Sequence, residues 1–169
     1  HPSRAQAEAG FAREEAAGIP RDHPTRMFRD TWPKPELLCA LGTFDALYGF
    51  RDPRRSAELF TALGVDALNA LIAPLRDPDD VAAVIRATCV SFLHLPHDGL
   101  VHEVVEAAWA HAEAPGDLGL FARTALQLAE IYPGDPGVLV ALLMNRITLQ
   151  RSEALYVPAD RRVLRRLGE

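Results

Sequence analysis

Apolar residues in the middle of the chain recur at the spacing of an α-helix, which predicts helices that each bury one face. The three clearest stripes are Val81, Val84, Ile85, Thr88, Cys89 and Phe92, then Val101, Val104, Val105, Ala108 and Trp109, then Leu118, Phe121, Ala122, Ala125, Leu128 and Ala129. Two shorter helices are predicted at residues 54–63 and 65–71, and Pro74, Pro96 and Pro115 mark connections. The pattern therefore predicts a compact bundle of about five helices.

The first segment of the chain favours a helix of another kind, one that is mostly solvated. Residues 3–17 are good helix formers, with Ser3 as the expected N-cap and Gly18 as the stop. Residues 19–34 are rich in Pro, Asp and Arg, which predicts an ordered loop.

Short apolar runs predict β-strands on both sides of the bundle. The continuous run at 37–41 predicts a buried strand, and 147–149 and 154–157 predict two short strands around a turn at Arg151 and Ser152. Strand, helical bundle and strand is the pattern of a helical domain inserted into a β-domain, with both ends returning to one sheet. The expected fold class is mainly α with short β segments.

Composition and net charge argue against some classes of partner. Hydrophobic residues make up 49% and charged residues 24% of the 169 residues, which is typical of a globular protein. A net charge of -5 argues against nucleic acid as a partner. No apolar run approaches the roughly 20 residues that span a bilayer, so no membrane is expected. Cys39 and Cys89 form no disulfide framework and suit a reducing cytoplasm.

Two groups of polar residues are candidates for chemistry. His94, His97, Asp98 and His102 are residue types that bind zinc or iron, but their irregular spacing on an interhelix connection favours a solvated loop. The run Lys34-Pro35-Glu36 places an ammonium and a carboxylate beside a proline that enforces extended backbone. From chemistry alone, a solvated turn is the favoured interpretation here too.

Several motifs along residues 1–159 follow the order and approximate spacing of one enzyme family. They are His-Pro-Ser at 1–3, Gly-Phe-Ala-Arg-Glu-Glu-Ala-Ala-Gly-Ile-Pro at 10–20, Lys-Pro-Glu-Leu at 34–37, Phe-Asp-Ala-Leu-Tyr-Gly-Phe-Arg at 44–51, Tyr-Pro-Gly-Asp at 132–135, Gly-Val-Leu at 137–139 and Glu-Ala-Leu-Tyr-Val-Pro-Ala at 153–159. Together they resemble the type I, zinc-dependent mannose-6-phosphate isomerases.

The resemblance implies a cupin β-barrel interrupted by a helical domain, with most of the barrel missing from this chain. It implies an aldose-ketose isomerase that interconverts mannose 6-phosphate and fructose 6-phosphate, with zinc as cofactor and a sugar phosphate as substrate. By the resemblance, His1 and Glu36 are zinc ligands. Lys34 is, by the same resemblance, an active-site lysine that contacts sugar oxygens or phosphate.

The chain departs from the family pattern at three places. The expected Gln ligand, two residues before His1, falls outside the chain, and residues 160–169 lack the His expected after 158–159. Trp32 and Pro33 stand where the family has Asn-His. Because two protein ligands rarely hold zinc, the isolated chain is not expected to be active.

The resemblance divides the chain and leaves other functions open. The expected parts are an N-terminal helix and metal-site loop at 1–36, a barrel strand and turn at 37–50, a helical domain at 51–145, a returning β-hairpin at 146–159 and a divergent basic tail at 160–169. One alternative function is a catalytically inactive helical interaction module derived from the family. Another is a related isomerase or sugar-binding cupin with a different sugar. Exposed strand edges also favour self-association.

Overall fold

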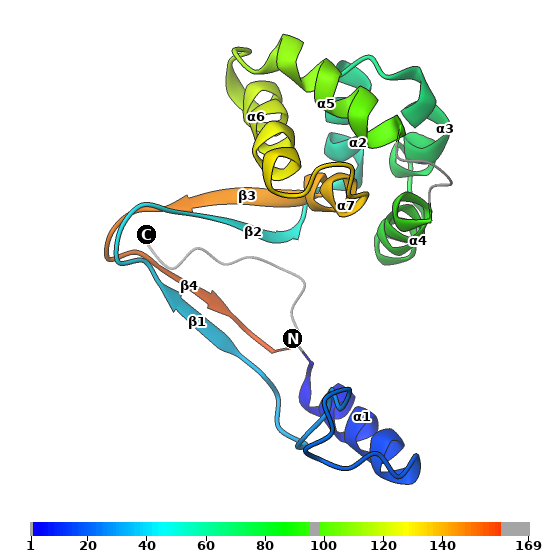
Figure 1. Ribbon diagram of the computed structural model, residues 1–169, viewed down its shortest axis with the longest axis vertical. Helices are drawn as coiled ribbons and strands as arrows, with labels where there is room; N and C mark the ends of the chain where they lie inside the picture. Colours follow the sequence, from blue (N-terminus) through cyan, green and yellow to red (C-terminus); the bar gives the residue numbers. More distant parts are fainter. Residues whose placement is uncertain (1, 95–98, 160–169) are drawn as a thin grey trace. The chain divides into compact units, whose positions relative to one another are not determined.

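A computed structural model describes residues 2–94 and 99–159 of the chain. The chain falls into two compact units. We call Leu47–Ile147 the helical unit, and His1–Ala46 together with Thr148–Glu169 the terminal unit. Figure 1 labels the helices and strands in chain order.

Two helices of the helical unit, α2 and α4, begin with an aspartate side chain that caps them. The helices of this unit are α2 (Pro53–Ala62), the 3-10 helix η1 (Asp66–Leu68), α3 (Asn69–Ile72), the 3-10 helix η2 (Ala73–Leu75), α4 (Val81–Leu93), α5 (Gly99–His111), α6 (Gly116–Ile131) and α7 (Gly137–Leu142). The Asp52 carboxylate accepts a hydrogen bond from the Arg55 N–H at the start of α2. Asp80 accepts from the N–H groups of Ala82 and Ala83 at the start of α4. The predicted helical bundle is confirmed.

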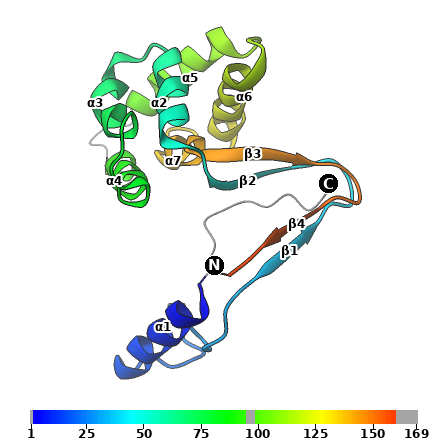
Figure 2. The same cartoon turned by 180° about the vertical axis from the view of Figure 1, so that it is seen from behind.

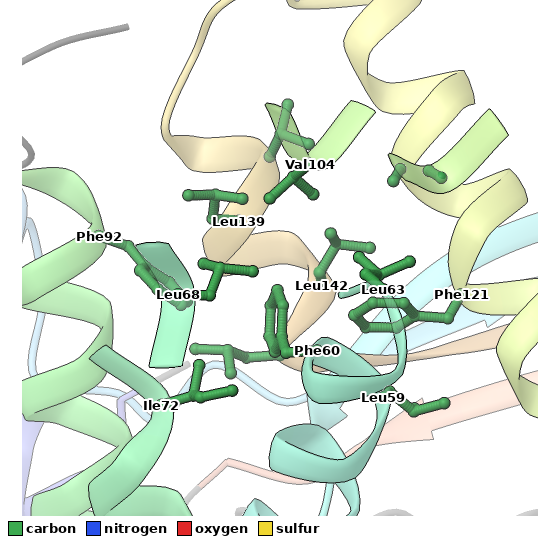
Figure 3. Packing of buried hydrophobic residues seen from close by; sticks show 14 of the residues in the cluster. Leu59, Phe60, Leu63, Leu68, Ile72, Phe92, Val104, Phe121, Leu139 and Leu142 are labelled. Carbon is green, nitrogen blue, oxygen red and sulfur yellow. The ribbon is translucent and has the colours of Figure 1, made fainter. Parts of the chain in front are cut away.

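Three phenylalanines form the centre of the helical unit. The Phe60 ring lies 5.6 Å from the Phe92 ring and 5.1 Å, edge to face, from the Phe121 ring, measured between centroids. Figure 3 shows these rings among the leucines and other apolar side chains that the helices contribute. Since all three phenylalanines are buried, their packing contributes strongly to stability.

Two residues of the predicted stripes are exposed. Trp109 is 69% exposed and Val81 is 51% exposed. Trp109 follows the buried Ala108 by one residue, which places it about 100° further round α5. Val81 is the first residue of α4, next to the capping Asp80. Helical spacing therefore identified the helices but overextended their buried faces by one position.

The terminal unit opens on a capped helix, α1 (Arg4–Ala16), as predicted. The Ser3 hydroxyl accepts a hydrogen bond from the Gln6 N–H, and the Gln6 side chain accepts one from the Ser3 N–H. The helix ends at Ala16 with Ala17 as its C-cap, followed by Gly18 with a φ of +69°. Helix α1 buries little apolar surface, because its only buried residues are Ala7, Gly10 and Glu14.

Two two-stranded sheets complete the described structure: β1 (Glu36–Cys39) pairs with β4 (Ala154–Val157), and β2 (Phe44–Phe50) pairs with β3 (Met144–Leu149). The first pair is antiparallel, with Glu36 opposite Val157. Figures 1 and 2 show the strands of each pair side by side from opposite sides. The predicted hairpin of the two C-terminal strands is wrong, since each pairs with an N-terminal strand instead.

Backbone hydrogen bonds explain why the turn near Ser152 does not make a hairpin. The Ser152 N–H donates to the carbonyl oxygen of Ala40, and the Ala40 N–H donates to the carbonyl oxygen of Glu153, both at 2.8 Å. The turn is therefore bound to the chain that follows β1. Strand β2 lies in the segment 37–50, for which one strand and a turn were predicted.

The expected burial of the strand at 37–41 is also wrong. Leu37 is 62% exposed and Leu41 is 90% exposed, whereas Ala40 and Leu155 are buried. A sheet of two strands covers neither of its own faces, so apolar side chains on it stay exposed unless another layer packs there. Within the described ranges, no helix is both long and apolar enough to cross a membrane.

Candidate functional site

The predicted site residues Lys34 and Glu36 lie where the loop after α1 enters β1. The Lys34 backbone N–H donates a hydrogen bond to the carbonyl oxygen of Pro2, with 3.3 Å between nitrogen and oxygen. This bond brings Lys34 beside the residue that follows His1 in the sequence. His1 itself lies outside the described residues.

Asp30 organises the turn that carries Lys34. The Lys34 Nζ lies 2.6 Å from Oδ1 and 2.5 Å from Oδ2 of Asp30. The Trp32 N–H also donates to Asp30 Oδ1, at 2.9 Å. The hydrogen bond from Lys34, followed by that from Trp32, holds the pKa of Asp30 below its ordinary value of 3.8. Asp30 is therefore ionised at neutral pH and fixes the Lys34 ammonium.

The Arg26 side chain, which is fully buried, holds the loop against α1. Its guanidinium donates to the carbonyl oxygens of Phe28, at 2.9 Å, and Ile19. It also donates to Glu15 Oε1 at 2.7 Å and lies 3.2 Å from Glu14 Oε2. A buried guanidinium with this many partners fixes the path of the loop, because removing a partner leaves a buried donor unpaired.

Glu14 supports the same loop from α1. Its carboxylate accepts hydrogen bonds from the N–H groups of Met27, at 3.2 Å, and Phe28, at 2.8 Å. Loss of water around Glu14 raises its pKa, but these two hydrogen bonds and the Arg26 charge together outweigh that effect. The pKa of Glu14 therefore lies below its ordinary value of 4.5.

Aromatic rings complete the packing between α1 and the loop. The guanidinium carbons of Arg21 and Arg26 lie 4.9 Å and 5.0 Å from the Phe11 ring centroid. The Phe28 ring lies so close to Gly10 that a Cβ built on Gly10 would be 2.5 Å from it. The loop that leads to Lys34 is thus held by charges and rings instead of by an aliphatic core.

Glu36 is the one predicted zinc ligand that the structure describes. It is the first residue of β1, is exposed and lies opposite Val157. In residues 2–94 and 99–159 no group of three or more His, Cys, Asp or Glu side chains could hold a metal ion. The described residues alone therefore do not fit a complete zinc site, which takes about four ligands.

The described histidines near residue 100 each have a partner on their own helix. His94 Nδ1 lies 2.8 Å from the carbonyl oxygen of Val90 on its own helix, and His102 Nε2 lies 3.4 Å from Glu106 on α5. His97 and Asp98 lie outside the described residues. The described members of this group have local partners, as expected for solvated residues.

Sequence reasoning did not find Asp30, Arg26 or Glu14. The signal for Asp30 was a carboxylate four residues before Lys34, but in a loop this spacing carries no fixed geometry. The pairing of Arg26 with Glu14 depends on a loop reversing its direction against α1. No periodic pattern in the sequence encodes that reversal.

Comparison with known proteins shows which proteins this chain resembles. No family model matches the chain. Mannose-6-phosphate isomerase of Escherichia coli (strain K12) is 31% identical over 160 residues, covering 95% of this chain and 39% of the relative. The Homo sapiens mannose-6-phosphate isomerase is 27% identical over 139 residues, covering 75% of this chain and 33% of the relative.

One solved structure that the chain resembles contains a sugar phosphate and zinc. The structure of mannose 6-phosphate isomerase from Salmonella typhimurium, bound to its substrate fructose 6-phosphate and to zinc, matches with a TM-score of 0.74 and 28% identity. The match covers 95% of this chain and 39% of that one. The chain thus spans about two fifths of the length of the relatives it matches.

Proposed function

We propose that this chain, which is homologous to the mannose-6-phosphate isomerases over 95% of its length, is a segment of a zinc-dependent enzyme that interconverts mannose 6-phosphate and fructose 6-phosphate. The observation that carries the proposal is the homology together with the position of Lys34 and Glu36. Both lie at one strand entrance, where a backbone hydrogen bond joins Lys34 to Pro2. The proposal concerns the activity of the longer protein.

In the proposed site, each named residue has a separate role. Lys34 binds an oxygen of the sugar phosphate through its ammonium, which Asp30 orients at 2.5 Å. Glu36 supplies one carboxylate ligand to zinc, and His1 is the second proposed ligand. The remaining ligands come from residues beyond those described, since one carboxylate does not hold zinc.

We propose the same wider setting for β1 and β4. The exposed Leu37 and Leu41 are suited to a second apolar layer, and a cupin barrel would supply it. When that layer is missing, the strand edges can pair with a second copy. The free thiols of Cys39 and Cys89 support the cytoplasm as the compartment.

A chimera tests the proposed function. The chain replaces the matching segment of the E. coli enzyme, and mannose 6-phosphate turnover and zinc content are measured before and after chelation. We expect turnover that is lost on chelation, with about one zinc per chain. Glu36→Gln should abolish both, whereas the control Glu103→Gln, on the exposed surface of α5, should change neither.

Two results would contradict the proposal. One is a folded chimera that contains no zinc and turns over no sugar phosphate, which would favour an inactive module derived from the family. The other is a Glu36→Gln chimera that keeps its zinc, because Glu36 would then not be a ligand. Circular dichroism of every variant checks that the helices form.

A further inference from the structure

We propose that Trp32, Asp30 and Lys34 form a sugar-binding shelf on which the ring of a hexose stacks, with Trp32 setting which sugar the site accepts. The inference rests on the proposed function for the identity of the sugar phosphate. It is carried by an exposed tryptophan whose backbone N–H donates to Asp30, the carboxylate that also pairs with the Lys34 ammonium. We call these three residues the Trp32 shelf.

Trp32 presents its ring to solvent while its backbone is fixed. The residue is 61% exposed, so much of its surface is open to a ligand. The backbone N–H of Trp32 donates to Asp30. The guanidinium carbon of Arg4 lies 5.0 Å from the centroid of the Trp32 ring. Arg4 is itself oriented by an ion pair with Glu8 at 2.9 Å. The ring is therefore an oriented, accessible apolar surface.

Asp30 and Lys34 keep free hydrogen-bonding capacity in the same turn as Trp32. A lysine ammonium has three donors, and a carboxylate has about four acceptor positions. Lys34 makes its two described side-chain contacts to Asp30, and Asp30 also accepts from Trp32. A hydroxyl group that accepts from Lys34 can at the same time donate to Asp30. The pair thus suits a hydroxyl better than it suits a simple ion.

The chemistry of the shelf matches a hexose ring. A hexose has a face of C–H groups that packs on an indole, and a rim of hydroxyl groups that both donate and accept. Inorganic phosphate fits less well, because the carboxylates of Asp30 and Glu8 offset the charges of Lys34 and Arg4. The position is also suitable, since Glu36, the proposed zinc ligand, follows Lys34 by two residues.

Tryptophan fluorescence tests the shelf without any turnover. The chain has two tryptophans, so Trp109→Phe leaves Trp32 as the only one. Titration of this variant with mannose 6-phosphate and with mannose should give a saturable change, and inorganic phosphate should give none. The matched control, Trp32→Phe, reports on the exposed Trp109 and should not respond. No saturable change from Trp32, or an equal change with phosphate, would overturn the inference.

Kinetics of the chimera separate this inference from the proposed function. In an active chimera, Trp32→Ala should raise the KM for mannose 6-phosphate by about tenfold and leave kcat within about twofold, since a stacking contact binds substrate and transition state alike. Trp32→Phe should retain most of the affinity. An unchanged KM in Trp32→Ala overturns the shelf alone. An inactive chimera whose Trp32 still responds to sugar overturns the proposed function alone.

Discussion

The two units of the chain are stabilised in different ways. The helical unit buries a continuous apolar cluster around Phe60, Phe92 and Phe121. Among the described residues of the terminal unit, the buried hydrophobic side chains are only Ala7, Ala40 and Leu155. Its buried charges, Glu14 and Arg26, pair with each other and bind the loop backbone.

This difference has a consequence for the site. Apolar burial is non-directional, so the helical unit can adjust to small changes without losing its fold. Hydrogen bonds and ion pairs depend on direction, so the loop that carries Lys34 depends on a few contacts of defined geometry. The unit with the stronger core is therefore not the one that carries the proposed chemistry.

The largest expected effect lies in the helical unit. Replacing the buried Phe121 by Ala removes its edge-to-face contact with Phe60 and leaves a cavity. We expect the free energy of unfolding to fall by about 3–5 kcal/mol. Urea denaturation, followed by circular dichroism of the helices, measures this. The exposed Trp109 is the control, since Trp109→Ala should change stability by less than about 0.5 kcal/mol. Equal losses for both variants would mean that the core is elsewhere.

The same contrast shows what the sequence predicted well. The helices α4, α5 and α6 were predicted because each repeats its apolar residues at helical spacing. Strand pairing was not predicted correctly, because periodicity indicates a strand but not its partner. The short helix α7 was missed, since its six residues are too few to show a period.

Of the candidate site, only residues that belong to a family motif were predicted from the sequence. Lys34 and Glu36 were found through their resemblance to a family motif, and the structure places both at the entrance to β1. Asp30 and Arg26 were not found, because their contacts depend on the path of an irregular loop. Trp32 was noted only as a departure from the family, and its exposure became visible in the structure.

A smaller effect is expected where α1 meets its loop. Gly10→Ala would place a Cβ 2.5 Å from the Phe28 ring, so the ring must move and the loop with it. We expect a destabilisation of the terminal unit of about 1–3 kcal/mol. Amide hydrogen exchange should show faster exchange at Met27 and Phe28, whose N–H groups bind Glu14. The control Gly42→Ala meets no neighbouring atom within 4 Å and should exchange as the parent does. Unchanged protection in Gly10→Ala would mean that the loop is held independently of this contact.

The smallest effect is a dependence on pH that only the terminal unit should show. Hydrogen bonds and nearby cations lower the pKa of Glu14 and Glu15 below 4.5, and that of Asp30 below 3.8. A carboxyl group whose pKa is lower in the folded state stabilises that state above its unfolded pKa. That stabilisation is lost as the pH falls through the folded value.

Acid should therefore loosen the loop below about pH 4.5, while the apolar core of the helical unit keeps its helices. In the Trp109→Phe variant, Trp32 fluorescence reports on the loop, because its backbone N–H is bound to Asp30. Circular dichroism reports on the helices. We expect the fluorescence to change at a higher pH than the helical signal, and Glu14→Gln, which lacks one of the titrating groups, to weaken the pH dependence. If the fluorescence and the helical signal changed together at one pH, the two units would unfold as one. The contrast between them would then not hold.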